Sequence, residues 1–239
     1  MSENINTIEL LFMEAGAEFI ESSMVLHNKL KNIKAFVFDW DGVFNNGEKN
    51  ENRSSNFNEA DSMGTNLLRY AHYKSHGELP ITAIISGEKN ALSFYFASRE
   101  RLHSCYFKIG NKIEALNHLC KEHDIKPEEV CYFFDDVLDL SIAKVCGIRI
   151  LMNRNAGLLF KQYVRENNLA DYITAHEGGN FALREACEML MGLSENFEEV
   201  IKDRTNYGAV YTAYIEKRNE ASTSFYTLSE GKILESPDN

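Results

Sequence analysis

The sequence predicts an α/β fold in which a mostly parallel sheet lies between two layers of helices. Short apolar runs typical of buried strands recur along the chain. Segments whose apolar residues follow helical spacing lie between these runs. Such an alternation of strands and helices predicts a parallel sheet covered on both faces, which is a Rossmann-like three-layer α/β/α arrangement.

Five strands and five helices carry this prediction. The strands are expected at 34–39, 81–85, 105–108 (a weaker run), 130–134 and 148–152. The helices are expected at about 62–76, 89–101, 112–123, 138–146 and 156–167. Ligands on such sheets bind beyond the carboxyl ends of the strands. Polar residues that directly follow the strands are therefore the first candidates for a site.

The remaining segments predict additions to this core. Residues 5–30 show the spacing of one long amphipathic helix, so residues 1–32 are expected to form an N-terminal helical extension to a core at 33–192. Residues 193–239 are expected to be a C-terminal extension, helical at about 196–218 and mobile over the last dozen residues.

Residues 43–60 interrupt the alternation near its start. They are polar and rich in Asn, and they are too long for a simple strand–helix loop. We expect a β-hairpin flap here.

Composition and charge exclude several classes of protein. The 239 residues are 44% hydrophobic and 26% charged, as in ordinary globular proteins. A net charge of −11 argues against a nucleic-acid binder but allows phosphorylated substrates, since a local cationic pocket can lie in an acidic protein. Five Cys without a CxxC pair predict buried free thiols in a reducing compartment.

Targeting signals are not evident in the sequence. The N-terminal segment is acidic where a signal peptide would be basic and then apolar. The sequence contains no run of about 18 apolar residues, which is the length that would predict a membrane span. We therefore expect a cytoplasmic protein that does not bind membranes.

Two carboxylates follow the first predicted strand, in the segment Phe38-Asp39-Trp40-Asp41-Gly42. If the backbone stays extended, Asp39 and Asp41 point to one side, where they repel each other unless a cation or proton intervenes. One interpretation of this pattern is a magnesium-assisted phosphoryl-transfer site. A solvated Asp-Gly turn is the alternative.

A second acidic group follows the strand at 130–134. Asp135, Asp136 and Asp139 could complete an oxygen-ligand shell for magnesium or manganese. Alternatively, Asp135 or Asp136 caps the next helix, and Asp139 is a first-turn acid that favours the helix dipole. A bound cation requires both acidic groups, whereas capping requires one.

Two further sites fit phosphate binding. The Ser86-Gly87 pair follows a strand and opens a helix, where a hydroxyl and free amides could bind phosphate oxygens, or Ser86 could simply be an N-cap. Lys112 begins a helix, where a cation opposes the helix dipole unless an anion lies nearby. Lys108 is a competing candidate.

Taken in order, these motifs resemble those of the haloacid dehalogenase superfamily of phosphatases, in particular its capless branch of sugar-acid phosphate phosphatases. The resemblance covers about residues 33–192 and predicts no large cap domain. The matching motifs are Asp39-Trp-Asp41-Gly-Val, the flap, Asp61-Ser-Met-Gly, Ile84-Ile-Ser-Gly87, Lys112-Ile-Glu-Ala-Leu, Asp135-Asp136-x-x-Asp139 and Gly178-Gly179…Arg184-Glu185.

The resemblance implies a role for each acid after the first strand. Asp39 would be the nucleophile that forms an aspartyl-phosphate. Asp41 would be the general acid and then the general base. Mg²⁺ would be bound by the Asp39 carboxylate, the backbone carbonyl of Asp41 and the Asp135 carboxylate. Asp136 and Asp139 would support these ligands from behind.

The resemblance also implies substrate contacts and an assembly. Ser86, Gly87 and Lys112 would bind the phosphoryl group. The substrate would be a small phosphorylated metabolite, a sugar or sugar-acid phosphate. Family members of this type are usually homotetramers in which a neighbour's flap and C-terminal segment help to close the site. Asp61 and Arg184 are therefore candidates for substrate contact.

Three positions depart from the usual pattern of this branch. Phe134 stands where Gly usually precedes the Asp-Asp pair, Glu88 replaces the Arg that usually follows Ser-Gly, and Ala60 replaces an Arg before Asp61. Replacing Arg with Glu adds repulsion toward an acidic substrate. The departures predict a less acidic substrate, or recognition moved to the C-terminal extension.

Two alternative functions follow from the same residues. One is a catalytically weak or inactive relative that serves as a binding or assembly module, which Phe134, Glu88 and the two terminal extensions favour. The other is a phosphorylated receiver domain, which also uses an aspartyl-phosphate. The order of the acids disfavours the receiver domain, because the second acidic group follows Lys112 in this chain.

Overall fold

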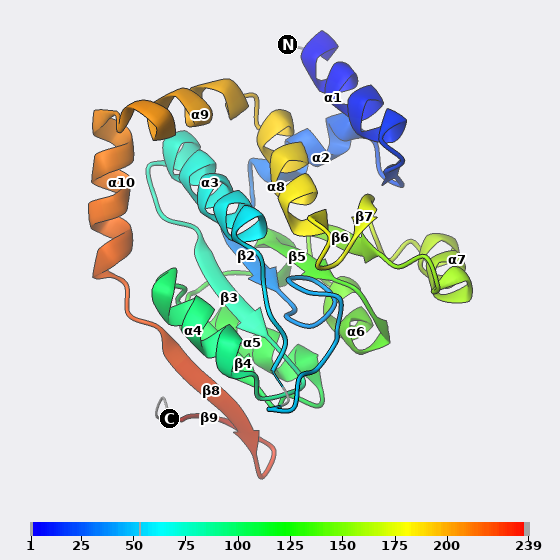
Figure 1. The fold of residues 1–239 in the computed structure, drawn as a ribbon, viewed down its shortest axis with the longest axis vertical. Helices are drawn as coiled ribbons and strands as arrows, with labels where there is room; N and C mark the ends of the chain where they lie inside the picture. Colours follow the sequence, from blue (N-terminus) through cyan, green and yellow to red (C-terminus); the bar gives the residue numbers. More distant parts are fainter. Residues whose placement is uncertain (1, 53, 237–239) are drawn as a thin grey trace.

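A nine-stranded sheet runs through the centre of the computed structural model, which describes residues 2–52 and 54–236 (Figure 1). The strand order is β1-β7-β6-β5-β2-β3-β4-β8-β9. The edge strands β1 and β9 run antiparallel to their neighbours, and all other pairs are parallel. The predicted α/β fold with a mostly parallel sheet is confirmed.

The strands lie close to their predicted positions, and four more are present. Their bounds are β1 Glu18–Phe19, β2 Ala35–Phe38, β3 Ile81–Ile85, β4 Ser104–Phe107, β5 Val130–Phe134, β6 Ile148–Asn153, β7 Tyr172–Glu177, β8 Ser224–Ser229 and β9 Lys232–Glu235. The strands that the sequence analysis did not identify are β1, β7, β8 and β9.

The helices between the strands cover both faces of the sheet. Their bounds are α1 Ser2–Glu14, α2 Ser23–Leu30, α3 Glu59–His76, α4 Ala91–Arg99, α5 Lys112–Glu122, α6 Leu140–Ala143, α7 Leu158–Glu166, α8 Ala182–Leu193, α9 Phe197–Asn206 and α10 Ala209–Glu220. Two 3₁₀ turns, η1 Pro127–Glu129 and η2 Val137–Asp139, flank β5.

The alternation of side chains along β2 divides the core into two halves. Phe36 and Phe38 pack on one face with α3, α4 and α8, whereas Ala35 and Val37 pack on the other face with α5, α6 and α7. Both faces of β2 are fully covered, as is expected for a central parallel strand. The strand therefore holds its carboxyl end rigidly, and this end carries Asp39.

The N-terminal extension differs from the prediction of one long helix. The helix α1 ends at Glu14, and α2 begins only at Ser23. Gly16 lies between them with φ +102°, a backbone conformation that glycine adopts readily and that no helix contains. The intervening β1 pairs with β7 at the edge of the sheet.

The flap also differs from the prediction, because its described residues form turns and irregular loop rather than a β-hairpin. The Asn side chains account for this difference. Asn45 Oδ1 accepts a hydrogen bond of 2.8 Å from the Gly47 amide, and Asn50 Oδ1 accepts bonds of 2.9 and 3.0 Å from the amides of Asn52 and Ser54. These local bonds take up amides that a strand ladder would need.

The C-terminal extension is more ordered than predicted. Its helical part is two helices, α9 and α10, which are separated by Tyr207 in the left-handed conformation (φ 49°). Beyond them, β8 pairs in parallel with β4, and β9 pairs with β8. The expected mobility of the last dozen residues is therefore wrong for β8 and β9, and residues 237–239 lie outside the described part.

Both extensions add strands to the sheet formed by residues 33–192. The division of the chain into an N-terminal extension, a core and a C-terminal extension therefore stays a prediction. All five cysteines are buried and none of them forms a disulfide, as predicted. No helix in the described part of the chain is both long and apolar enough to cross a membrane.

The packing of β8 yields a test of how firmly the C-terminal extension joins the core. Phe225 is 5% exposed and stacks on Phe94 with ring centroids 4.7 Å apart. We expect Phe225→Ala to lower the free energy of unfolding by about 3 kcal/mol, because it leaves a cavity at this contact. Urea unfolding measures the loss.

Leu234→Ala on β9 is the matched control, because Leu234 is 50% exposed. We expect it to change the free energy of unfolding by less than about 0.5 kcal/mol. Equal, small effects of the two substitutions would show that β8 does not pack as described.

Candidate active site

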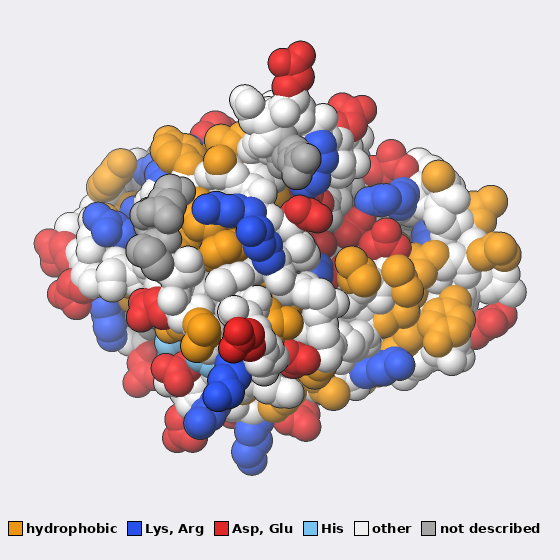
Figure 2. Space-filling model, turned by 90° about the horizontal axis from the view of Figure 1, so that it is seen from below, with side chains coloured by type: hydrophobic (Ala, Val, Ile, Leu, Met, Phe, Trp, Pro, Cys, Tyr) orange, Lys and Arg blue, Asp and Glu red, His pale blue; other side chains and the backbone are white. Residues whose placement is uncertain are grey.

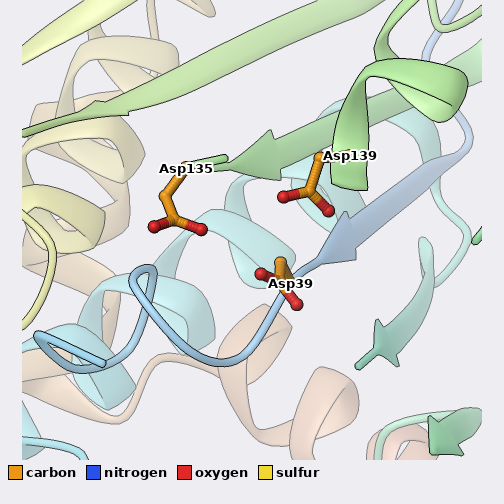
Figure 3. A group of neighbouring side chains, drawn as sticks. All are labelled: Asp39, Asp135 and Asp139. Atoms are coloured by element: carbon orange, nitrogen blue, oxygen red, sulfur yellow. The ribbon is translucent and has the colours of Figure 1, made fainter. Parts of the chain in front are cut away.

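Three carboxylates converge where the central strands end (Figure 3). Asp39 follows β2 and Asp135 follows β5, and the register of these paired strands places Phe38 opposite Phe133. Asp139 ends the turn η2. One carboxylate oxygen from each of the three residues lies within 4.8 Å of the other two. The pairing of β2 with β5 thus brings together the two acidic groups that the sequence analysis singled out.

Lys112 is buried between two of these carboxylates. Its ammonium lies 2.7 Å from Asp39 Oδ1 and 2.5 Å from Asp139 Oδ1, and its side chain is 3% exposed. Burial alone would lower the pKa of Lys112, but Asp39 and Asp139 outweigh burial and raise this pKa above its usual value. Lys112 is thus a fixed cation beside Asp39.

The remaining carboxylates need more positive charge than Lys112 supplies. Burial raises the pKa of Asp39, and burial together with the charge of Asp39 raises the pKa of Asp135. A further cation beside Asp39 and Asp135, in addition to Lys112 and Arg154, would therefore stabilise the ionised form of these two carboxylates. Carboxylate oxygens at this spacing suit a hard divalent ion such as Mg²⁺ or Mn²⁺, so the donor set fits the predicted metal.

Asp41 points away from this group, toward the flap. Its carboxylate accepts a hydrogen bond from the Ser55 hydroxyl and forms an ion pair with Lys49. The intervening Trp40 is fully buried and stacks on Phe44 with ring centroids 4.7 Å apart. Asp39 and Asp41 are therefore held at different sides of the pocket, which suits two different chemical roles.

The turn after Asp41 allows very close packing of backbones. Gly42 has φ +85°, and a Cβ there would lie 2.0 Å from Asp135 Oδ2. Gly178, in the loop before α8, approaches the same turn from the other side, and a Cβ there would lie 1.8 Å from the Gly42 carbonyl oxygen. A Cβ at residue 42 would displace the Asp135 carboxylate, and a Cβ at residue 178 would displace the backbone of the turn that follows Asp41.

A pocket of about 260 Å³ opens in front of Asp39. Ser86 and Gly87 line it at the end of β3, and Lys112 lines it at the start of α5. The three predicted phosphate-binding residues thus share one pocket with Asp39 and Asp41. Lys108, the competing candidate, is exposed and does not line this pocket.

The two other acids after β5 differ in their surroundings. Asp136 is exposed, and its side chain caps η2 by accepting a 2.7 Å hydrogen bond from the Val137 amide. Asp139 is buried and accepts a 2.5 Å hydrogen bond from the Tyr132 hydroxyl. Asp136 therefore has the capping role that the sequence analysis kept as an alternative, whereas Asp139 belongs to the buried ionic group.

Asp61 and Arg184 do not line the pocket in the described part of this chain, so their substrate contact, which was expected in an assembly with a neighbouring subunit, stays a prediction. Asp61 is fully buried, and its Oδ1 accepts a 2.8 Å hydrogen bond from the Arg184 amide at the start of α8. The Arg184 side chain pairs with Glu188 at 2.6 Å. The reason is geometric, since α3 and α8 pack together and the Asp61 carboxylate caps the first turn of α8.

Sequence reasoning missed two cations at the pocket. Arg154 lines it and forms an ion pair with Asp135, and Lys49 reaches Asp41 from the flap. Arg154 directly follows β6, so the rule that sites gather at strand ends could have identified it. No local pattern marks Lys49, because the irregular path of the flap decides where it points.

Comparison with known proteins agrees with this geometry. No protein-family model matches the chain. The 3-deoxy-D-manno-octulosonate 8-phosphate phosphatase KdsC of Escherichia coli K12 is 28% identical over 167 residues, which is 68% of this chain and 81% of KdsC. Its counterpart from Yersinia pestis is 25% identical over 172 residues, covering 70% of this chain and 84% of that protein.

Two solved structures are similar over nearly their whole length. A probable YrbI family phosphatase from Pseudomonas syringae is 30% identical with a TM-score of 0.64, covering 76% of this chain and 98% of that one. This chain belongs to the YrbI family of phosphatases. The Moraxella catarrhalis 3-deoxy-D-manno-octulosonate 8-phosphate phosphatase is 28% identical with a TM-score of 0.60, covering 74% and 96%. The resemblance to the haloacid dehalogenase superfamily is thus confirmed.

The close approach of Gly178 yields a test of the pocket geometry in this YrbI family member. We expect Gly178→Ala to lower the free energy of unfolding by about 2 kcal/mol or more and phosphatase activity by at least about tenfold, since the Gly42 carbonyl must move. Gly110→Ala, where no atom lies within 4 Å of the new Cβ, is the control and should behave as the wild type. Similar behaviour of both variants would contradict the packing.

The burial of Asp61 yields a pH test of stability. Burial raises the pKa of Asp61 from 3.8 to about 6, although the hydrogen bond from the Arg184 amide acts to lower this pKa. A carboxyl with a raised pKa stabilises the fold fully below its unfolded pKa and loses that contribution as pH rises through about 6. Compared with Asp61→Asn, the wild type should thus lose up to about 3 kcal/mol between pH 4 and pH 8.

Urea unfolding of both proteins across this pH range measures the difference. The slope of the difference with pH is the diagnostic quantity, because all other titrating groups are common to the two proteins. A difference that stays constant would show that Asp61 titrates normally.

Proposed function

We propose that this protein hydrolyses phosphomonoesters of sugars or sugar acids in a magnesium-dependent reaction through an aspartyl-phosphate on Asp39. The observation that carries the proposal is the buried ionic group in which Lys112 lies 2.7 Å from Asp39 and two more carboxylates face the same point. Its relatives support it, since they are named as phosphatases, and the Moraxella structure is a complex with magnesium, phosphate and KDO.

Asp39 and Asp135 would hold the magnesium ion, together with the backbone carbonyl of Asp41. Asp139 faces the same point but also accepts hydrogen bonds from Lys112 and Tyr132. Asp139 would therefore orient Lys112 and balance part of its positive charge. When bound, the ion neutralises phosphoryl charge so that an anionic ester can approach the Asp39 carboxylate.

The first chemical step would be attack of the Asp39 carboxylate on phosphorus. The new bond joins an Asp39 oxygen to phosphorus, and the bond from phosphorus to the alcohol oxygen breaks. Ser86 and the Gly87 amide would orient the phosphoryl oxygens, while Lys112 offsets their charge. A carboxylate is ionised at neutral pH when its charge is compensated, so it needs no base to act as the nucleophile.

Asp41 would transfer protons in both steps. In the first step it gives a proton to the leaving alkoxide, and in the second it takes a proton from the water that attacks the aspartyl-phosphate. Its carboxylate already lies among hydrogen-bonding groups, Ser55 and Lys49, that can stabilise it after the proton has left. Inorganic phosphate and free Asp39 result.

Assembly and location extend the proposal. A homotetramer remains a prediction from the family resemblance, and a cytoplasmic location remains a prediction from the sequence, in which no targeting segment was recognised. The flap, which is expected to contribute to a neighbour's site, is an irregular loop in this chain and not a hairpin. Its contribution would therefore come from side chains such as Lys49 and not from an added strand.

The test of the proposed function is phosphate release from an aryl phosphate and a panel of sugar phosphates, with and without magnesium. We expect Asp39→Asn to lower turnover by about 10³-fold or more, because the nucleophile is lost. Asp124→Asn, a matched change at an exposed residue outside the pocket, should leave turnover unchanged.

Acid quenching during turnover should trap phosphate on the wild type and not on Asp39→Asn. Turnover that is independent of the metal, or equal in Asp39→Asn and the wild type, would contradict the proposal. A folded wild type without any turnover would favour the alternative of a binding or assembly module.

A further inference from the structure

The pocket in front of Asp39 has an unusual balance of charge. Among the described residues that line it, six are carboxylates and two are cations, Lys112 and Arg154. The carboxylates are Asp39, Asp41, Glu88, Asp135, Asp136 and Asp139. In Figure 2, which looks onto the end of the molecule where the parallel strands finish, acidic side chains gather near the centre of the face. A divalent cation and a phosphoryl dianion together add no net charge, so this pocket stays negative when loaded.

Five of the six carboxylates already have partners. Asp39 and Asp139 contact Lys112, and Asp135 contacts Arg154. The contacts of the other two are Asp41 with Lys49 and Ser55, and Asp136 with the Val137 amide.

Glu88 is the exception. Within residues 2–52 and 54–236, the Glu88 side chain forms no ion pair and no hydrogen bond. Its backbone amide donates a hydrogen bond of 3.3 Å to Ser86 Oγ. A carboxylate that lines a ligand pocket and is not used by the fold is available for the ligand.

The position of Glu88 fixes which part of a substrate it faces. It lies two residues after Ser86, which would contact the phosphoryl group, and it lines the same pocket of about 260 Å³. In so small a space, the carbon atoms next to the phosphate ester lie within reach of the Glu88 side chain. Glu88 is exposed and lines the pocket, so with the phosphoryl group at Ser86 and Lys112 its carboxylate would be free to contact the alcohol part of the substrate.

The flap side of the pocket offers amide side chains beside two charged residues, Glu48 and Lys49. Gly47 lines the pocket, and its neighbours Asn46 and Glu48 line a second hollow of about 430 Å³ beneath the flap. Further lining residues of this hollow include Asn50, Asn56 and Phe57. Amide side chains both donate and accept hydrogen bonds without charge, which suits hydroxyl groups.

We propose that Glu88 selects a phosphorylated sugar or polyol whose remaining part carries hydroxyl groups and no carboxylate. The Glu88 carboxylate would accept hydrogen bonds from two neighbouring hydroxyls of the substrate. The same carboxylate repels a second anionic group on the substrate, in a pocket that is already negative. This inference rests on the proposed phosphatase function and names its substrate class.

The experiment compares kcat/KM for neutral hexose and pentose phosphates with kcat/KM for octulosonate 8-phosphate, each divided by the value for an aryl phosphate. The wild type should prefer the neutral sugars. Glu88→Gln should lower this preference by about tenfold and Glu88→Arg by about 100-fold, because a like charge is removed or reversed. Glu78→Gln removes the same charge at a residue that does not line this pocket, and it should leave the preference unchanged.

Two results would overturn the inference while leaving the proposed function intact. One is a wild type that hydrolyses the sugar-acid phosphate better than the neutral sugar phosphates. The other is a preference that stays unchanged in both Glu88 variants while magnesium-dependent hydrolysis of the aryl phosphate persists.

A binding measurement separates the inference from a failure of the proposed function. Calorimetric titration of Asp39→Asn with the same two classes of sugar phosphate needs no turnover. Tighter binding of the neutral sugar phosphate, lost in Asp39→Asn/Glu88→Gln, would support the role of Glu88. Equal binding of both classes, or tighter binding of the sugar acid, would overturn it even if the wild type proved inactive.

Discussion

The buried ion group around Lys112 is the interaction on which the site depends. It connects three elements that are distant in the sequence, since Asp39 follows β2, Lys112 begins α5 and Asp139 ends η2. Removing one member would leave an uncompensated charge in the core, and such a change destabilises a protein strongly. The surroundings are built accordingly, with Tyr132 donating a hydrogen bond to Asp139.

This constraint explains why the neighbouring backbone is so closely packed. The turn that carries Asp41 passes between Asp135 and the loop before α8, and Gly42 and Gly178 make that approach sterically feasible. The departure at Phe134 fits the same frame. Its ring is fully buried and lies parallel to that of Tyr132, with centroids 5.8 Å apart, so it supports the residue that orients Asp139.

The extensions change the periphery of the family fold and leave its centre intact. The C-terminal extension adds β8 and β9 beyond β4, and α9 and α10 pack beside α3. None of these elements lines the pocket at Asp39 in the described residues. Under the proposed function, recognition of the substrate within one chain would therefore fall to the flap, Glu88 and Arg154.

The layered fold and the core strands could be predicted from the sequence, as could the candidate site residues Asp39, Asp41, Ser86, Lys112 and Asp135. The apolar runs of the strands and the spacing and order of these residues can be recognised in the sequence without any knowledge of tertiary contacts. The course of the flap, the pairing of β8 with β4 and the contacts of Asp61, Lys49 and Arg154 could not be predicted from the sequence and became known from the structure. The physical reason is that these features depend on partners far away in the chain or on competition between side chains and backbone for the same hydrogen bonds.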